Sequence, residues 1–87
     1  MRVLIVEDEP TIAAQLSDAL TVAGYAVDVA GNGVDAHFQG NDENQPFDVV
    51  VLDLGLPQMD GLTVLKKWRT AGRTMPVLIL TARDNWH

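Results

Sequence analysis

The chain has 87 residues, which allow one small domain at most. Its formal net charge of −6 at pH 7 argues against nucleic-acid binding by this segment itself, because neutralising phosphates needs clustered Lys and Arg side chains. The lack of cysteine excludes a disulfide framework and a thiolate site, and no apolar run approaches the roughly 20 residues of a membrane span. We therefore expect a cytoplasmic domain without membrane contact.

Residues 2–6 are predicted to form the first strand, because four apolar residues follow one another without polar alternation. This run ends in Glu7 and Asp8. Pro10 suits the first turn of a helix, where its missing N–H costs nothing. Apolar residues then recur at three- and four-residue intervals, as one helix face requires: Ile12, Leu16, Ala19, Leu20 and Ala23. Gly24 follows where a helix C-cap belongs.

A shorter strand is predicted over residues 25–30, and its more polar composition places it near the edge of the sheet. Residues 31–33 break the chain with two glycines. A short helix follows, marked by three spaced side chains: Val34, His37 and Phe38. A polar surface loop is expected over residues 40–46. Residues 47–53 are predicted to form a strand buried on both faces, because four consecutive residues, 49–52, are apolar without polar alternation. This central strand ends in Asp53.

The last predicted helix begins at Asp60, a favourable N-cap residue. Its inward side chains are expected to be Leu62, Leu65 and Trp68. Gly72 ends this helix, and residues 76–81 form a fourth apolar strand that ends in Thr81. The alternation of strands and helices predicts right-handed βαβ units and a parallel sheet.

Polar side chains follow three strands of this sheet at its carboxyl edge: Glu7 and Asp8, Asp53, and Thr81. Ligands bind beyond this edge in open α/β sheets. Two carboxylates about 4 Å apart repel each other by roughly 4 kcal/mol at an effective dielectric of 20, so such a cluster favours a hard divalent cation such as Mg²⁺. A metal beside a nucleophilic Asp is a site for phosphoryl transfer. Each residue alone also has a purely structural explanation: Asp8 could cap the following helix, and Thr81 could simply end its strand.

Three segments together carry a family resemblance: VEDEP over 6–10, VLDLGLPQMDG over 51–61 and LTAR over 80–83. With them the chain resembles the receiver domain of bacterial two-component response regulators, in the OmpR/PhoB subfamily and close to PhoP-like regulators. The resemblance implies a flavodoxin-like (CheY-like) α/β fold, a doubly wound parallel sheet with strand order 2-1-3-4. It also implies that residues 1–87 are the N-terminal portion of a single receiver domain, without a second domain.

The resemblance implies a role for five residues. Asp53 would accept a phosphoryl group from a phosphohistidine on a sensor histidine kinase. Asp8, Asp53 and the backbone carbonyl of Gly55 would bind Mg²⁺, and Glu7 would hold a water on the metal. Thr81 would be the switch hydroxyl that moves to hydrogen-bond the phosphoryl group. Such a domain is not an enzyme beyond the uptake of phosphate and the hydrolysis of its own aspartyl phosphate.

The chain departs from the family pattern because it lacks the fifth strand, with its Lys-Pro, and the last two helices. The missing lysine would contact the phosphoryl group, so we expect impaired phosphorylation of this chain. The fourth strand would be left as an apolar edge over 77–80, which invites pairing with another chain. We therefore expect a homodimer or a swapped oligomer through this edge. DNA binding would come only through an output domain that is absent here.

Two other functions use similar elements. A phosphatase of the haloacid dehalogenase type also has a strand-end Asp nucleophile and Mg²⁺, but it needs a second Asp where this chain has Gly55. A pseudo-receiver or flavodoxin-like binding module would lack phosphotransfer. The intact acid set counts against the pseudo-receiver, and the absence of a hydroxyl- and Gly-rich loop after the first strand counts against flavin binding.

Overall fold

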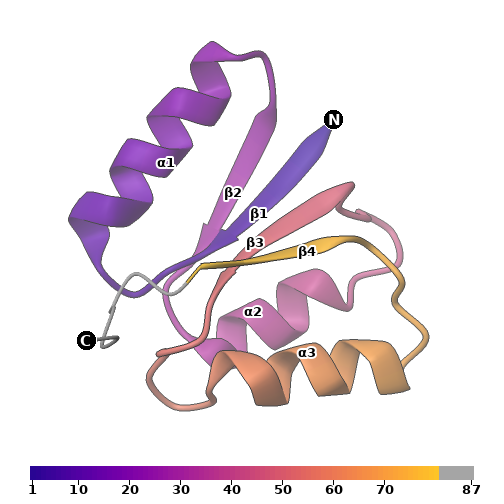
Figure 1. Cartoon of the computed structure of the whole chain (residues 1–87). Coiled ribbons are helices and arrows are strands. Elements are labelled where there is room, and N and C mark those ends of the chain that lie inside the picture. Colours follow the sequence, from indigo (N-terminus) through magenta and orange to yellow (C-terminus); the bar gives the residue numbers. More distant parts are fainter. Residues whose placement is uncertain (81–87) are drawn as a thin grey trace.

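A computed structural model describes residues 1–80 of the chain. The elements in chain order are β1 (Arg2–Val6), α1 (Pro10–Val22), β2 (Ala26–Ala30), α2 (Gly33–Gly40), β3 (Val49–Asp53), α3 (Gly61–Thr70) and β4 (Val77–Leu80). The four strands are parallel and form one sheet in the order β2-β1-β3-β4, which confirms the predicted topology. In Figure 1, α1 covers one face of the sheet, while α2 and α3 lie side by side on the other.

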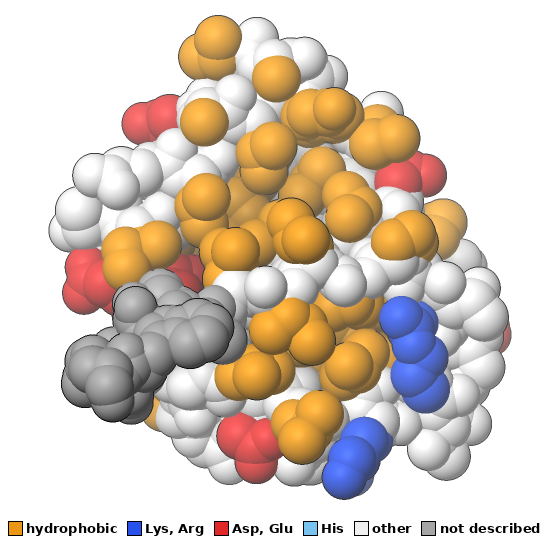
Figure 2. Space-filling view, viewed as in Figure 1, with side chains coloured by type: hydrophobic (Ala, Val, Ile, Leu, Met, Phe, Trp, Pro, Cys, Tyr) orange, Lys and Arg blue, Asp and Glu red, His pale blue; other side chains and the backbone are white. Residues whose placement is uncertain are grey.

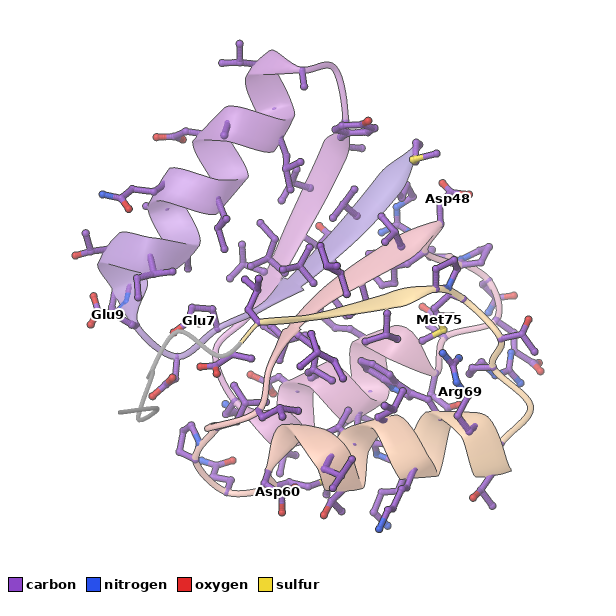
Figure 3. All side chains as sticks on the ribbon, viewed as in Figure 1. Glu7, Glu9, Asp48, Asp60, Arg69 and Met75 are labelled. Atoms are coloured by element: carbon purple, nitrogen blue, oxygen red, sulfur yellow. The ribbon has the colours of Figure 1, made fainter. Side chains whose placement is uncertain are left out.

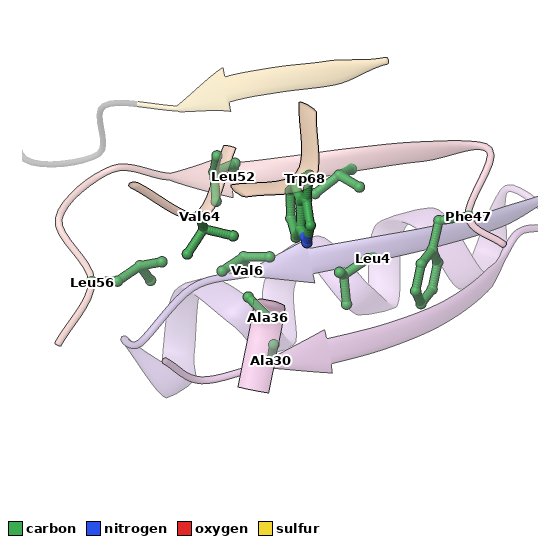
Figure 4. Packing of buried hydrophobic residues seen from close by; sticks show 10 residues of the cluster. Leu4, Val6, Ala30, Ala36, Phe47, Leu52, Leu56, Val64 and Trp68 are labelled. Atoms are coloured by element: carbon green, nitrogen blue, oxygen red, sulfur yellow. The ribbon is translucent and has the colours of Figure 1, made fainter. Parts of the chain in front are cut away.

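The larger part of the core lies between the sheet and the α2–α3 layer (Figure 4). Trp68 is fully buried there among side chains of β1 and β3, and its Nε1–H donates to the carbonyl of His37 at 3.3 Å. Gly40 makes room for the indole, because a Cβ at that position would lie 2.4 Å from Trp68 Cε2. The indole thereby joins α3 to α2 as well as to the sheet.

The smaller part of the core lies under α1. Val3, Ile5 and Val51 are buried on this face of the sheet, and Leu16 and Leu20 of the helix pack against them. The helix begins at Pro10 with Glu9 as its N-cap and ends before Gly24, whose φ of +101° suits a residue without Cβ. Two members of the predicted apolar face, Ala19 and Ala23, are exposed, so the buried stripe is narrower than the sequence indicated.

Two apolar side chains of the α2–α3 layer, Leu62 and Phe38, are exposed, and Leu62 was expected to point inward. Leu62 is 48% exposed, and Val64 lies inward in its place, four residues before Trp68 on the same helix face. Phe38 is 69% exposed, because α2 buries its small residues Gly33, Ala36 and Gly40 against neighbouring elements. Close approach of α2 to α3 leaves no space for a large ring on the buried side.

The β4 edge of the sheet is apolar and accessible among the described residues. Leu78 is 58% exposed and Ile79 is 43% exposed. Figure 2 shows hydrophobic side chains gathered across the face of the molecule that β4 crosses. Within residues 1–80, no helix combines the length and the apolar character that crossing a bilayer requires.

Candidate metal centre

Three carboxylates converge at the carboxyl ends of the two central strands, as the sequence predicted. Val6 of β1 pairs with Leu52 of β3, so Glu7 and Asp53 leave the sheet side by side. One oxygen from each of Glu7, Asp8 and Asp53 lies within 4.8 Å of the other two. Figure 3 shows Glu7 at this edge, between the end of β1 and the start of α1. The spacing is short enough for one small ion to be shared.

Two of these carboxylates are almost completely buried, and each is only partly hydrogen-bonded. Glu7 and Asp53 are each 3% exposed. Glu7 Oε1 accepts from the N–H of Glu9 at 3.0 Å, and Asp53 Oδ1 accepts from the N–H of Gly55 at 3.1 Å. Among the described residues, the second oxygens, Glu7 Oε2 and Asp53 Oδ2, are buried without a hydrogen-bond partner. Buried unpaired oxygens are costly, and hard oxygen donors are what Mg²⁺ binds, so the residues fit this metal.

The electrostatics of the cluster also favour a bound cation. Burial raises the pKa of Glu7 above its usual 4.5, the Glu9 N–H opposes the rise, and the negative charges of Asp53 and Asp8 add to it. Each of these causes except the Glu9 hydrogen bond reflects uncompensated negative charge in a poorly solvated place. A divalent cation among the three side chains would remove that cost.

The N-cap of α1 is Glu9 and not Asp8. Glu9 Oε1 accepts from the N–H of Thr11 at 2.8 Å, as an N-cap side chain does. The alternative explanation of Asp8 as a helix cap is therefore wrong. Asp8 is half-buried and lies with the acid cluster.

The loop between β3 and α3 is held at its end by Asp60 and Gly61. Asp60 caps α3 as predicted, and its Oδ1 accepts from the N–H of Thr63 at 2.9 Å. This bond, with a second from the Thr63 hydroxyl, lowers the pKa of Asp60 below its usual 3.8. Gly61 donates its N–H to the carbonyl of Leu54 at 3.1 Å, where a Cβ would lie 2.6 Å from the carbonyl oxygen of Asp53. The loop start and the helix start are thus in direct contact.

Gly55 and Thr81 are the remaining predicted site residues. The N–H of Gly55 orients Asp53, while a metal contact of its carbonyl stays a prediction. Thr81 lies outside the described residues. Sequence reasoning missed Gly33, which we treated only as part of a chain break, although it contacts the loop that follows Asp53. A hollow of about 380 Å³ near Arg73 lies at the opposite end of the sheet and includes none of the three acids.

A family model for the response regulator receiver domain matches residues 3–87. The chain belongs to this family. This receiver domain is 42% identical over 86 residues to the virulence transcriptional regulatory protein PhoP of Salmonella typhimurium strain LT2, covering 99% of the chain and 38% of PhoP. It is 46% identical over 84 residues to the transcriptional regulatory protein QseB of Haemophilus influenzae, covering 97% of the chain and 37% of QseB. The chain therefore spans less than two fifths of these relatives.

Solved receiver structures share the fold. The Francisella response regulator 1452 receiver domain superposes with a TM-score of 0.87 at 33% identity, over 97% of this chain and 68% of that one. The Thermotoga maritima response regulator TrrA, in complex with Mg²⁺ and BeF, has a TM-score of 0.85 at 32% identity, over 99% and 73%. A Pseudomonas aeruginosa histidine kinase receiver domain, with magnesium in its active-site cleft, has a TM-score of 0.86 at 30% identity, over 94% and 67%. These matches support neither the phosphatase nor the flavin-binding alternative.

Proposed function

We propose that this receiver domain accepts a phosphoryl group on Asp53 from the phosphohistidine of a sensor histidine kinase, with Mg²⁺ bound beside it. The observation that carries the proposal is the cluster of Glu7, Asp8 and Asp53, whose oxygens lie within 4.8 Å of one another at the carboxyl edge of the sheet. Two solved relatives support the choice of metal: the Thermotoga maritima protein is in complex with Mg²⁺ and BeF, and the Pseudomonas aeruginosa receiver domain has magnesium in its active-site cleft.

Asp53 is the acceptor in this proposal because of its position and its hydrogen bonding. It is the last residue of β3, and the Gly55 N–H holds one of its oxygens at 3.1 Å. A carboxylate oxygen of Asp53 attacks phosphorus, the N–P bond of the phosphohistidine breaks, and its electron pair returns to the imidazole nitrogen. The product is an aspartyl phosphate. A receiver therefore catalyses only its own phosphorylation and the later hydrolysis of that bond.

The remaining acids hold the metal in this proposal. Asp8, Asp53 and the carbonyl of Gly55 would bind Mg²⁺ directly, and Glu7 would hold one of its waters. When bound, Mg²⁺ neutralises charge on the cluster and on the phosphoryl oxygens. Thr81 would supply the switch hydroxyl. The register of the sheet supports this role, because Asp53 pairs with Leu80, which directly precedes Thr81 in the sequence.

Labelling with a small phosphoryl donor tests the proposal. A protein that contains residues 1–87, given acetyl phosphate and MgCl₂, should gain one acid-stable and base-labile phosphate, and EDTA should prevent this. Asp53→Asn should remove the phosphate, whereas Asp18→Asn, which changes an exposed carboxylate of α1, should keep it. Phosphate that persists in Asp53→Asn would show that another residue is the acceptor.

The larger protein and its partners belong to the same proposal. Residues 1–87 would form the N-terminal portion of a receiver domain, since they cover 68% of the Francisella receiver chain. An output domain elsewhere in the protein would bind DNA, since PhoP and QseB are transcriptional regulatory proteins. We place such a regulator in the cytoplasm. The 87-residue chain would form a homodimer or a swapped oligomer through β4, a proposal that the exposure of Leu78 and Ile79 supports.

A further inference from the structure

The first residue of α2 touches the loop that follows Asp53. Gly33 is buried, and its N–H donates to the carbonyl of Pro57 at 3.3 Å. A Cβ at Gly33 would lie 1.8 Å from the carbonyl oxygen of Met59 and 2.6 Å from its carbonyl carbon. These are backbone atoms, so they cannot rotate away as a flexible side chain could. Only glycine permits this approach.

The loop over 54–60 is held by backbone hydrogen bonds at both ends and has an unusual backbone conformation in its middle. At its start, the Gly55 N–H binds Asp53 Oδ1, and at its end the Gly61 N–H binds the Leu54 carbonyl. Between them, Gln58 has a φ of +70°, a left-handed conformation that a side chain disfavours. Such strain persists where the surroundings determine the backbone. From α2, the N–H of Gly33 adds its hydrogen bond to the Pro57 carbonyl.

We propose that Gly33 is a positioning residue, which lets the first turn of α2 hold the loop so that Gly55 stays beside Asp53. The proposal rests on the assignment of Asp53 and Gly55 to the metal and phosphoryl site. A methyl group at Gly33 would push Met59 back by about 1.6 Å, from 1.8 Å to the 3.4 Å of ordinary contact. Pro57, which accepts from Gly33, is only two residues from Gly55, so this displacement reaches the site.

Magnesium titration of the 87-residue chain tests this role without any phosphorylation. Gly33→Ala should weaken Mg²⁺ binding by about 10- to 100-fold, the usual loss when a residue that orients metal ligands is changed. Gly31→Ala is the matched control, since a Cβ at Gly31 meets nothing within 4 Å, and it should bind Mg²⁺ as the unchanged chain does. Adding Gln58→Gly to Gly33→Ala should restore part of the affinity, because glycine allows the displaced loop to readjust.

A second measurement needs no substitution and covers the case in which Gly33→Ala fails to fold. In the unchanged chain, Mg²⁺ should shift the backbone amide resonance of Gly33 together with that of Gly55. The amide of Gly72, at the opposite end of the sheet, should stay in place. An amide of Gly33 that ignores Mg²⁺, or a folded Gly33→Ala chain with unchanged affinity, would overturn the proposal. If Asp53 takes up no phosphate in a longer protein that contains residues 1–87, while Gly33→Ala still weakens Mg²⁺ binding, the acceptor assignment fails and the positioning role stands.

Discussion

Replacing Asp53 by Asn should stabilise the metal-free chain, although Asp53 is the residue on which the proposed function depends. The change removes one negative charge from a place where two nearly buried carboxylates, Glu7 and Asp53, have oxygens within 4.8 Å. Asn keeps the size of the side chain and an oxygen for the Gly55 N–H. Its amide also offers a donor to Glu7 Oε2, which has no partner among the described residues.

The size of the effect follows from the distance. Two unit charges 4.8 Å apart repel each other by about 3.5 kcal/mol at an effective dielectric of 20. Burial and this repulsion both raise the pKa of Glu7 above its usual value. We therefore expect about 1–3 kcal/mol of added stability at neutral pH after relaxation, which raises Tm by at least about 4 °C for a domain of this size.

Thermal unfolding in EDTA and in excess MgCl₂ provides the assay. The unchanged chain should gain about 2.7 kcal/mol when Mg²⁺ reaches 100 times its Kd, whereas Asp53→Asn should gain far less. Asp18→Asn, on the exposed face of α1, should follow the unchanged chain in both buffers. If the Tm of Asp53→Asn in EDTA is lower than that of the unchanged chain, charge repulsion does not destabilise the cluster. An equal gain from Mg²⁺ in both chains would place the ion elsewhere.

Three further predictions concern the supporting structure. Gly40→Ala should cost about 1–3 kcal/mol in urea unfolding, because its Cβ meets Trp68 Cε2 at 2.4 Å; a loss no larger than that of Gly31→Ala would contradict this. Leu78→Lys should weaken association in sedimentation velocity, since a charge blunts an exposed edge, and unchanged association would place the contact elsewhere. The lowered pKa of Asp60 adds stability that is present above its usual 3.8 and lost as pH falls through the lower folded value. Asp60→Asn keeps an N-cap oxygen but has no carboxylate to protonate, so its Tm should fall less than that of the unchanged chain between about pH 5 and 2. An equal fall of Tm in both chains would exclude Asp60 as the source of the lost stability.

Patterns along the chain predicted the elements well because each rests on local chemistry. Unbroken apolar runs marked β1 and β3, while Pro10 and Asp60 marked helix starts that depend on the residue itself. The convergence of Glu7 and Asp53 was also predictable, since carboxyl ends of neighbouring parallel strands meet at one edge. The helix faces were less predictable. Phe38 is the largest apolar side chain of its helix and yet points to solvent.

The sequence alone determined which segments are strands and helices, the order of the sheet through its resemblance to receivers, and the acids that meet at its edge. Only the tertiary structure decided how closely α2 approaches its neighbours, and so why Gly33 and Gly40 lie where no side chain fits. The reason is physical: hydrophobic periodicity indicates that a helix has a buried side, but the space available there, and so which residues fit it, depends on atoms contributed by distant segments. Met59 and Trp68 set that space, and neither is near these glycines in the chain.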